Sequence, residues 1–267
     1  MNGLDTLIQY LLDENPQYSD VQIPEDLQGK RDLFRALRNI RPPLPLSEEF
    51  LRLQDEELQT QLQEKGIVEL PQLPTLNPKL STTLNSKPTT LNYILWQGDI
   101  TRLRADAIVN AANSQMLGCF QPLHSCIDNI IHTKAGIGLR LECARIMAEQ
   151  GHPEPTGQAK ITPAFDLPCR YVLHTVGPIV QGRLTREHED LLRSSYLSCL
   201  KLAAEKGLKS IAFCCISTGV FMFPNERAAE IAVETVRAWL DETGSDMKVI
   251  FNVFKDVDLE IYERILG

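Results

Sequence analysis

Apolar residues recur at helical spacing in the N-terminal part of the chain. Leucine and isoleucine positions within residues 4–12 lie three or four residues apart, and a proline ends the run. A second helix is expected to begin at Pro24 and to end before the Arg-Pro-Pro at 41–43. A third is expected after Ser47, a good helix-capping residue, and to stop at Gly66. The pattern therefore predicts a helical N-terminal region.

After this region the hydrophobic pattern changes. Residues 71–90 are rich in Pro, Ser, Thr and Asn, which predicts a linker or an irregular crossing segment. Short apolar runs typical of buried strands then alternate with longer amphipathic stretches typical of helices. This alternation predicts an α/β fold with helices on both faces of a sheet. The expected strands lie at 91–96, 105–110, 159–165, 171–176, 210–217 and 248–254, and the expected helices at 128–150, 186–206, 225–242 and 256–266.

Charge divides the chain at the same place. Of the 35 acidic and 27 basic residues, 14 acidic and 7 basic ones lie in residues 1–75, which leaves 21 and 20 for the remainder. We therefore expect an acidic helical extension at 1–75, a linker at 76–90 and the α/β domain at 91–267. The net charge of -8 and the lack of a long basic run argue against polymeric nucleic acid or an anionic membrane surface as a partner.

The N-terminus and the cysteines bear on the compartment. The first residues lack the basic start and the apolar core of a secretory signal, and no later segment has ~18 consecutive apolar residues. We therefore expect a cytoplasmic protein. Seven cysteines, all after residue 118, are an odd number in a chain too large to need disulfide staples. Reduced thiols and metal ligands are the expected roles.

Polar and glycine-containing motifs follow several of the expected strands. They are GDIT at 98–101, DAIVNAANS at 106–114, IDNIIHTKAG at 127–136, TGQAKITPAFDLPCRYVLHTVGP at 156–178 and STGVFMFP at 217–224. Singly they consist of ordinary turn-forming residues. In this order they resemble the macrodomain family of ADP-ribose-binding modules, most closely its MacroD-type branch, which hydrolyses ADP-ribose from modified proteins. The resemblance implies a three-layer α/β/α macrodomain with a central mixed sheet.

The resemblance also implies which residues bind the ligand. Asp99 is expected to accept a hydrogen bond from the adenine amino group, and the backbone N–H of Ile100 to serve the ring. Asn113 is expected to hold the distal ribose, and Phe254 is a further candidate for packing near adenine. A glycine lets backbone N–H groups approach a diphosphate closely. The expected diphosphate loop comprises Ser217, Thr218, Gly219, Val220 and Phe221, with Phe221 shielding the distal ribose.

Asp128 matches the catalytic carboxylate of the MacroD-type branch, and we expect it to act together with Asn113. Ile127 precedes it and is expected to line the same ligand site. Taken without the family, the residue types also fit a helix or turn cap at Asn113 and a helix cap at Asp128, because polar caps are common. Four further residues on apolar segments are interpreted as packing residues: His132, His174, Cys214 and Cys215.

The stretch between Asn113 and Asp128 departs from the macrodomain pattern. Only Gly118 remains of the usual glycine-rich loop, and Cys119, His124 and Cys126 follow it with C-x4-H-x-C spacing. Thiolates and imidazole are preferred zinc ligands, and three of them leave a fourth position open, as in catalytic sites. The spacing alone also fits thiols that merely pack. The loop and the acidic extension resemble a zinc-containing subgroup of macrodomains from bacteria and fungi, which implies one Zn²⁺ at these residues.

The expected function is a zinc-dependent hydrolase that removes mono-ADP-ribose from protein side chains. The resemblance to the MacroD-type branch implies that the cleaved bond is an ester to Asp or Glu. Zinc would either activate a water or orient the ribose while Asp128 positions the water. The subgroup implies a sirtuin-type ADP-ribosyltransferase and a metabolic carrier protein as partners. The alternatives are a non-catalytic ADP-ribose reader and an O-acetyl-ADP-ribose deacetylase. The N-terminal helices fit either a docking adaptor or a structural cover.

Overall fold

The computed structural model describes residues 3–73 and 93–267 and contains a central six-stranded mixed sheet. Neighbouring strands are parallel except at one edge, where β5 (Ala159–Pro163) runs antiparallel to β6 (Tyr171–Thr175). Most of the strands are short runs of β-branched and other apolar residues. In spatial order the strands are β2 (Tyr93–Gln97), β8 (Lys248–Val253), β7 (Ser210–Phe213), β4 (Ala107–Ala111), β6 (Tyr171–Thr175) and β5 (Ala159–Pro163).

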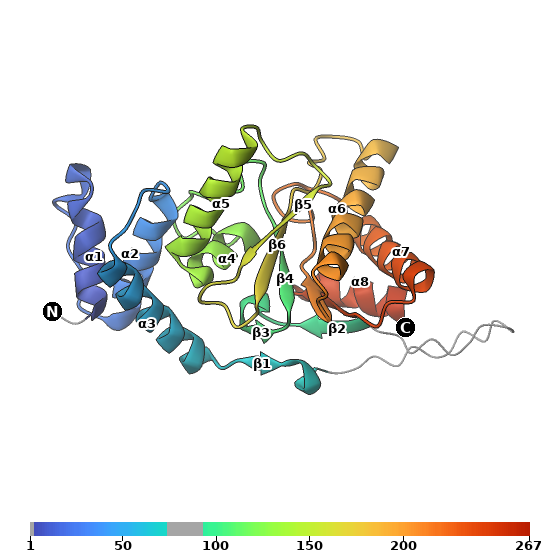
Figure 1. The fold of residues 1–267 in the computed structure, drawn as a ribbon, viewed down its shortest axis with the longest axis horizontal. Coiled ribbons are helices and arrows are strands. Elements are labelled where there is room, and N and C mark those ends of the chain that lie inside the picture. Colours follow the sequence, from blue (N-terminus) through green and yellow to red (C-terminus); the bar gives the residue numbers. More distant parts are fainter. Residues whose placement is uncertain (1–2, 74–92) are drawn as a thin grey trace, which may run out of the picture.

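Helices cover both faces of this sheet, as the sequence predicts. Figure 1 shows α4 and α5 on one side of the strands and α6, α7 and α8 on the other. The helix bounds are α4 Ile127–Ala135, α5 Ile137–Gln150, α6 Arg186–Glu205, α7 Asn225–Thr243 and α8 Asp256–Leu266. The three-layer α/β/α architecture with a mixed sheet is therefore confirmed.

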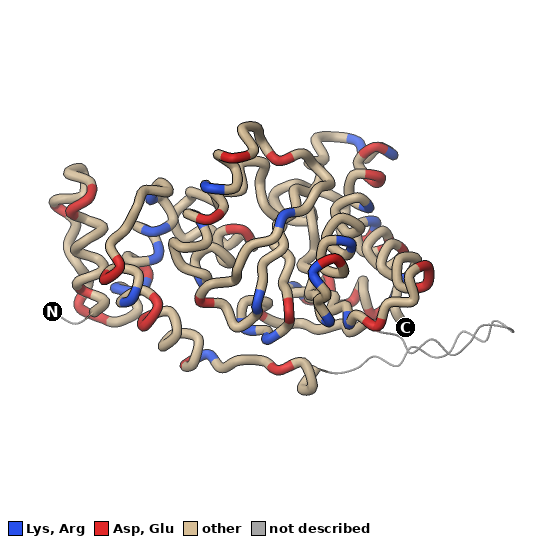
Figure 2. Tube along the Cα trace, viewed as in Figure 1, with Lys and Arg blue, Asp and Glu red and all other residues tan. Residues whose placement is uncertain are grey.

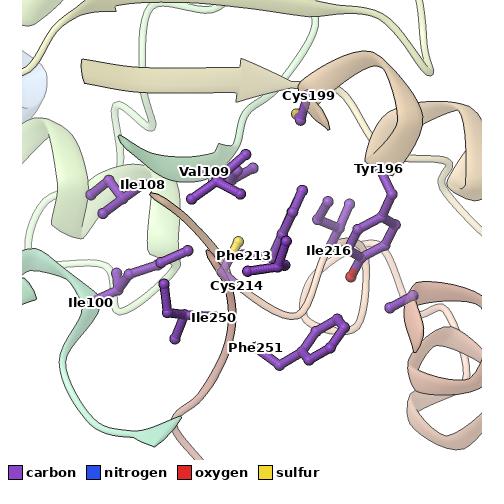
Figure 3. Packing of buried hydrophobic residues seen from close by; sticks show 14 of the residues in the cluster. Ile100, Ile108, Val109, Tyr196, Cys199, Phe213, Cys214, Ile216, Ile250 and Phe251 are labelled. Carbon is purple, nitrogen blue, oxygen red and sulfur yellow. The ribbon is translucent and has the colours of Figure 1, made fainter. Parts of the chain in front are cut away.

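The core lies between the sheet and the helices. Ile108 of β4 and Ile250 of β8 are fully buried, and Phe213 and Phe251 are 1% exposed. Phe213 and Phe251 lie on the face of the sheet that α6 covers, where Phe213 packs against Tyr196, while Ile108 and Ile250 lie on the opposite face (Figure 3). Full burial of such a side chain stabilises the fold by roughly 1.5–3 kcal/mol relative to exposure. This packing fixes the sheet whose strand ends carry the candidate site.

The N-terminal region forms three helices, α1 (Gly3–Asp13), α2 (Leu27–Ile40) and α3 (Glu48–Lys65). They share an apolar cluster of their own, which includes Leu7, Phe34 and Phe50 and is joined by Ile137 of α5. Helix α2 begins at Leu27 instead of the expected Pro24, because the Asp26 side chain accepts from the Gly29 N–H and caps the helix there. Ser47 caps α3, as predicted.

A short pair of strands joins this region to the α/β domain. β1 (Val68–Glu69) runs parallel to β3 (Leu103–Arg104), a pairing that the hydrophobic pattern does not predict. Short 3-10 helices lie at Pro16–Tyr18, Leu70–Gln72 and Ile100–Arg102. The expected linker at 76–90 lies outside the described residues, so the domain boundaries stay a prediction.

Two expected elements differ from the structure. The helix expected at 128–150 is two helices, because Gly136 adopts φ +83°, a left-handed conformation that ends α4. The strand expected at 210–217 ends at Phe213, since the chain turns toward Ser217, whose φ is +66°. Cys214 and Cys215 therefore follow the strand instead of lying within it.

Charged residues are spread over both parts of the molecule (Figure 2). Within residues 3–73 and 93–267, none of the helices has the length and apolar character needed to cross a membrane. The expected cytoplasmic location stays a prediction.

Candidate functional site

The parallel strands bring most of the candidate residues to one edge of the sheet. β2, β8, β7 and β4 all point the same way, so their carboxyl ends lie along the same edge. Asp99 follows β2, Phe254 follows β8, Ser217 follows β7 and Asn113 follows β4. In α/β sheets this edge is where ligands bind.

Asp99 is ordered by the turn that follows β2. Its Oδ1 accepts from the backbone N–H of Thr101 at 3.0 Å and from the Thr101 hydroxyl at 2.6 Å, which caps the short 3-10 helix. Ile100 is 2% exposed and anchors the turn in the core. Among the described residues, no hydrogen bond involves Oδ2 of Asp99, so this oxygen is the one suited to accept from a ligand.

The carboxylate of Asp128 lies at the centre of a buried amide network. Asn110 of β4 donates to Oδ1 at 2.8 Å, and Asn113 donates to Oδ2 at 3.0 Å. Asp128 is 5% exposed and lies in the first turn of α4, where Cys126 is the capping residue instead. The helix-cap interpretation of Asp128 is therefore wrong, because the Cys126 sulfur takes that position.

Burial dominates the electrostatics of Asp128. It raises the pKa of the carboxyl to about 6, against the lowering effects of the Asn110 and Asn113 amides and the Arg140 charge. The group is consequently a carboxylate at neutral pH that sits close to its protonation point. Such a group can both hold a water and accept a proton from it.

Asn113 has local partners as well as Asp128. Its Oδ1 accepts from the Gln115 N–H at 3.0 Å, so it does form the turn cap that its residue type also predicts. Its amide nitrogen bonds Gly118 O at 3.1 Å in addition to Asp128. The Asn113 side chain thus connects the end of β4 to Gly118, just before Cys119, and to the carboxylate of Asp128.

Cys119, His124 and Cys126 converge although four residues separate the first two. Their ligand atoms all lie within 4.8 Å of one another, and Cys119 Sγ is 3.4 Å from His124 Nδ1. Zn–S and Zn–N bonds of about 2.3 and 2.0–2.1 Å at a tetrahedral angle would place these atoms about 3.5 Å apart. The donor set and its spacing therefore fit a zinc ion.

All three residues of this set are half-buried, and Cys126 lies at the start of α4. Its Sγ accepts from the Asn129 N–H at 3.4 Å at the start of α4. Burial raises the pKa of the thiol to about 12, and the neighbouring Cys119 and Asp128 add to that effect. A coordinating metal ion offsets such a shift, because it displaces the thiol proton.

The loop after β7 has the features expected of a diphosphate site. The Ser217 hydroxyl is buried and has no hydrogen-bond partner among the described residues, whereas the Thr218 hydroxyl donates to Cys215 O at 3.0 Å. A Cβ at Gly219 would meet open space, so a ligand can approach the backbone there. Val220 is 66% exposed, and Phe221 is half-buried.

The remaining candidates differ in their surroundings. Phe254 is 75% exposed, so its ring is available to a ligand and does not pack within the described residues. Ile127 is half-buried against the core at the start of α4. Cys214 is buried, and all seven cysteines are free thiols.

His132 and His174 are buried, in agreement with a packing role. His174 Nδ1 lies 3.2 Å from the Asn110 amide and Nε2 3.0 Å from the Thr162 hydroxyl, so both ring nitrogens have partners. His132 Nε2 is 3.6 Å from Asp128 Oδ1. Burial lowers the pKa of His174 to about 3 and that of His132 well below its ordinary value, so both rings are neutral. These neutral rings lie beside Asn110 and Asp128 without adding charge.

Sequence reasoning missed four polar residues around the candidate site. Asn110 belongs to the same motif as Asn113, and its position inside β4 gave no separate signal. Arg35 and Arg140 act through contacts with segments distant in the chain, and Asn129 donates to loop carbonyls 8 and 10 residues away, so local spacing offers no indication of any of them. These residues are Asn110, Asn129 and Arg140 in the α/β domain and Arg35 in α2.

The fold and these motifs agree with comparisons to known proteins. The Macro domain family model matches residues 109–232. A Treponema medium protein named protein-ADP-ribose hydrolase is 56% identical over 261 residues, covering 98% of this chain and 97% of the relative. The chain therefore belongs to the macrodomain family. Its similarity to that relative includes the N-terminal helices.

Two further comparisons add to this result. The crystal structure of the Trypanosoma brucei macrodomain in complex with ADP-ribose has a TM-score of 0.66 and 33% identity, covering 86% of this chain and 94% of that chain. A Fusarium oxysporum f. sp. cubense protein named as a probable bifunctional ADP-ribose hydrolase/ADP-ribosyltransferase is 42% identical over 266 residues, which are 96% of this chain and 44% of the relative.

Proposed function

We propose that this protein removes mono-ADP-ribose from modified protein side chains, with one zinc ion held by Cys119, His124 and Cys126. The names of its relatives support the hydrolase activity. The single observation that carries the zinc dependence is the convergence of these three ligand atoms within 4.8 Å, on the loop between Asn113 and Asp128. The glycine-rich loop usual in this place would supply no such donors.

The linkage proposed is an ester between the distal ribose and an Asp or Glu side chain. Its hydrolysis consumes one water and releases ADP-ribose and the free carboxylate. Bound zinc would supply Lewis-acid chemistry, by lowering the pKa of a bound water or by gripping ribose hydroxyls. The protein's own groups orient the reacting atoms: Asn113 holds the ribose, and Asp128 positions the water and accepts its proton at Oδ1 or Oδ2.

The rest of ADP-ribose would occupy the neighbouring strand ends. Asp99 Oδ2 is suited to the adenine amino group, and Phe254 to stacking on the ring. The buried Ser217 hydroxyl and the open backbone at Gly219 are suited to the diphosphate. Phe221 would then cover the distal ribose. These residues bind the ligand in a hydrolase and in a reader alike, so they do not separate the two functions.

The proposed physiological partner is a sirtuin-type ADP-ribosyltransferase that modifies a metabolic carrier protein. A relative that carries both hydrolase and ADP-ribosyltransferase names in one chain supports a transferase partner. The carrier and the sirtuin type rest on the resemblance to the zinc-containing subgroup.

The decisive experiment follows release of ADP-ribose from a mono-ADP-ribosylated protein, with and without a chelator. We expect stoichiometric zinc in the purified protein, turnover that the chelator abolishes, and recovery when zinc is added. Cys119→Ser and Cys126→Ser should lose both zinc and turnover, while Cys169→Ala, a buried cysteine outside the loop, should retain both. ADP-ribose binding without release would indicate a reader, and turnover confined to O-acetyl-ADP-ribose would indicate a deacetylase.

A further inference from the structure

The loop that carries the zinc ligands is held from outside the α/β domain. We call residues 117–126 the ligand loop. Arg35 of α2 donates from Nη2 to the backbone carbonyl of His124 at 2.7 Å and to Asn129 Oδ1 at 3.0 Å. These contacts join residues 89 and 94 positions apart in the chain. A helix of the N-terminal extension therefore touches the backbone of a proposed ligand.

Asn39, one turn further along α2, makes the neighbouring contact. Its Oδ1 accepts from the Leu123 N–H at 3.0 Å, and its amide donates to the Thr133 hydroxyl of α4 at 3.0 Å. Leu123 has φ +56°, a left-handed conformation that is uncommon for a residue with a branched side chain. Asn39 is 2% exposed. The hydrogen bond from Leu123 helps to hold this unfavourable turn just before His124.

Asn129 links the other two proposed ligands to the same helix. Its side-chain amide donates to Cys119 O at 3.2 Å and to Gln121 O at 2.9 Å, and its backbone N–H donates to Cys126 Sγ. Its Oδ1 accepts from Arg35, so the carbonyl end of this fully buried amide is fixed by α2. Each of the three ligand residues is thus bonded to Arg35 or to Asn129.

Arg140 closes the beginning of the loop against the end of α2. Its Nε donates to Leu117 O at 2.8 Å, and its Nη1 donates to the backbone carbonyls of Arg38 and Arg41 at 2.8 and 2.6 Å. Its guanidinium carbon lies 4.4 Å from the centre of the Phe120 ring. Cations are favoured at the carboxyl end of a helix, where carbonyls lack partners. The loop is therefore tied to α2 at both ends.

We propose that α2 is a built-in support of the ligand loop, in which Arg35 and Asn39 are positioning residues that keep His124 oriented for zinc. This proposal rests on the proposed zinc site. Residues that orient metal ligands typically change metal affinity by 10–100-fold when they are mutated. The inward-facing contacts of Arg35 and Asn39 are used within the chain, which favours this role for α2 over that of a partner-docking surface.

The test compares three full-length variants. Arg35→Ala and Asn39→Ala remove contacts with the ligand loop. Arg31→Ala is the matched control, because Arg31 lies one turn earlier on the same helix and bonds Glu57 and Glu64 of α3 instead. For each protein, zinc affinity is measured by competition with a chromophoric chelator, and unfolding by a thermal melt. Hydrogen exchange of the amides in residues 117–126 is measured in the metal-free protein.

We expect Arg35→Ala and Asn39→Ala to weaken zinc binding by about tenfold or more and to speed hydrogen exchange in the ligand loop. These effects should appear even if the two variants melt at the same temperature as Arg31→Ala. Arg31→Ala should leave both properties within about twofold of the wild type, since the hydrogen bonds of Arg31 go to α3 and not to the ligand loop. Unchanged zinc affinity and exchange in the first two variants, or an equal effect in the control, would overturn the proposal. A wild-type protein that binds no zinc would overturn the proposed function, while the exchange rates would still report separately on the contact with α2.

Discussion

The amide nitrogen of Asn113 lies 3.0 Å from Oδ2 of Asp128 and 3.1 Å from the carbonyl oxygen of Gly118. The same side chain therefore orients the carboxylate and fixes the beginning of the ligand loop. Because Asn110 holds the other carboxylate oxygen from β4, Asp128 has little freedom to rotate. A ribose bound by Asn113 would compete for one of these hydrogen bonds, which couples ligand binding to the setting of Asp128.

Asp128→Asn tests the role of the carboxylate. We expect ADP-ribose release to fall by about 10²–10⁴-fold, because the variant cannot accept a proton. Its amide would face the donor of Asn110 or Asn113, at a cost in stability of about 1–3 kcal/mol. Single-turnover release and urea unfolding separate the two effects. Thr235→Val, which removes a buried hydroxyl from α7 outside the site, supplies a destabilised control that should keep its activity. Retention of more than about a tenth of the wild-type rate would assign proton transfer to another group.

Ser217→Ala separates ligand binding from stability. The Ser217 hydroxyl is buried and has no partner among the described residues, so its removal should leave the melting temperature unchanged or raise it. Affinity for ADP-ribose should fall by roughly tenfold, the loss of one hydrogen bond to a charged group. Thr218→Val should lower the melting temperature, because the Thr218 hydroxyl donates a hydrogen bond to Cys215 O that the variant loses. Calorimetric titration and thermal melts check both. Equal ADP-ribose affinity in Ser217→Ala and the wild type would remove this hydroxyl from the diphosphate site.

Gly118→Ala tests the close packing beneath the ligand loop. Gly118 has φ +80°, and a Cβ there would lie 2.8 Å from the His132 ring. Backbone strain of this kind costs about 1–3 kcal/mol, and the ring contact adds to it. Gly182→Ala is the control, because Gly182 also has a positive φ but would meet no atom within 4 Å among the described residues. Urea unfolding should show the larger loss for Gly118→Ala. Equal losses would mean that His132 gives way without cost.

Asp166→Asn tests the pH dependence of the contact between α3 and the α/β domain. Burial, and then the nearby Asp55, raise the pKa of Asp166 to about 7, while Gln59 opposes the shift with a hydrogen bond. A raised carboxyl pKa gives stability that is full below about pH 4, declines as the pH rises and is lost above about pH 7. The wild type should therefore lose stability relative to Asp166→Asn between pH 5 and pH 8, by roughly 1–2 kcal/mol after solvent screening. An equal difference at both pH values in urea unfolding would contradict the assignment.

The hydrophobic pattern of the sequence predicts most of the helices and strands. Buried strands such as Ala107–Ala111 and amphipathic helices such as Asn225–Thr243 owe their form to residues that are close in sequence, so spacing predicts them. The errors lie where a backbone detail decides. The cap at Asp26 shortens α2, and the left-handed Gly136 divides a predicted helix. Gly136 also lies against Gln54 of α3, a contact that no local pattern contains.

The candidate site likewise contains residues that the sequence predicts and residues that it does not. Cys119, His124, Cys126 and Asp128 share one short stretch, so spacing and family resemblance identify them together. Arg35 and Arg140 could not be found, because they act on this stretch through backbone carbonyls of segments distant in the chain. A carbonyl acceptor is present at every residue and leaves no mark on the sequence. Only the packing of α2 against α4 shows which carbonyls are used.

The bonds from Arg140 to the carbonyls of Arg38 and Arg41 also set an order of events during synthesis. The two partners are separated by 102 and 99 residues, so the first helices leave the ribosome long before the side chain that completes their end. Contacts of such long range form only after the intervening chain is available, and the loop-closure entropy that they cost slows folding. Helix α2 is thus translated well before Arg140, and a nascent chain halted before residue 140 would carry this helix without the side chain that binds its last carbonyls.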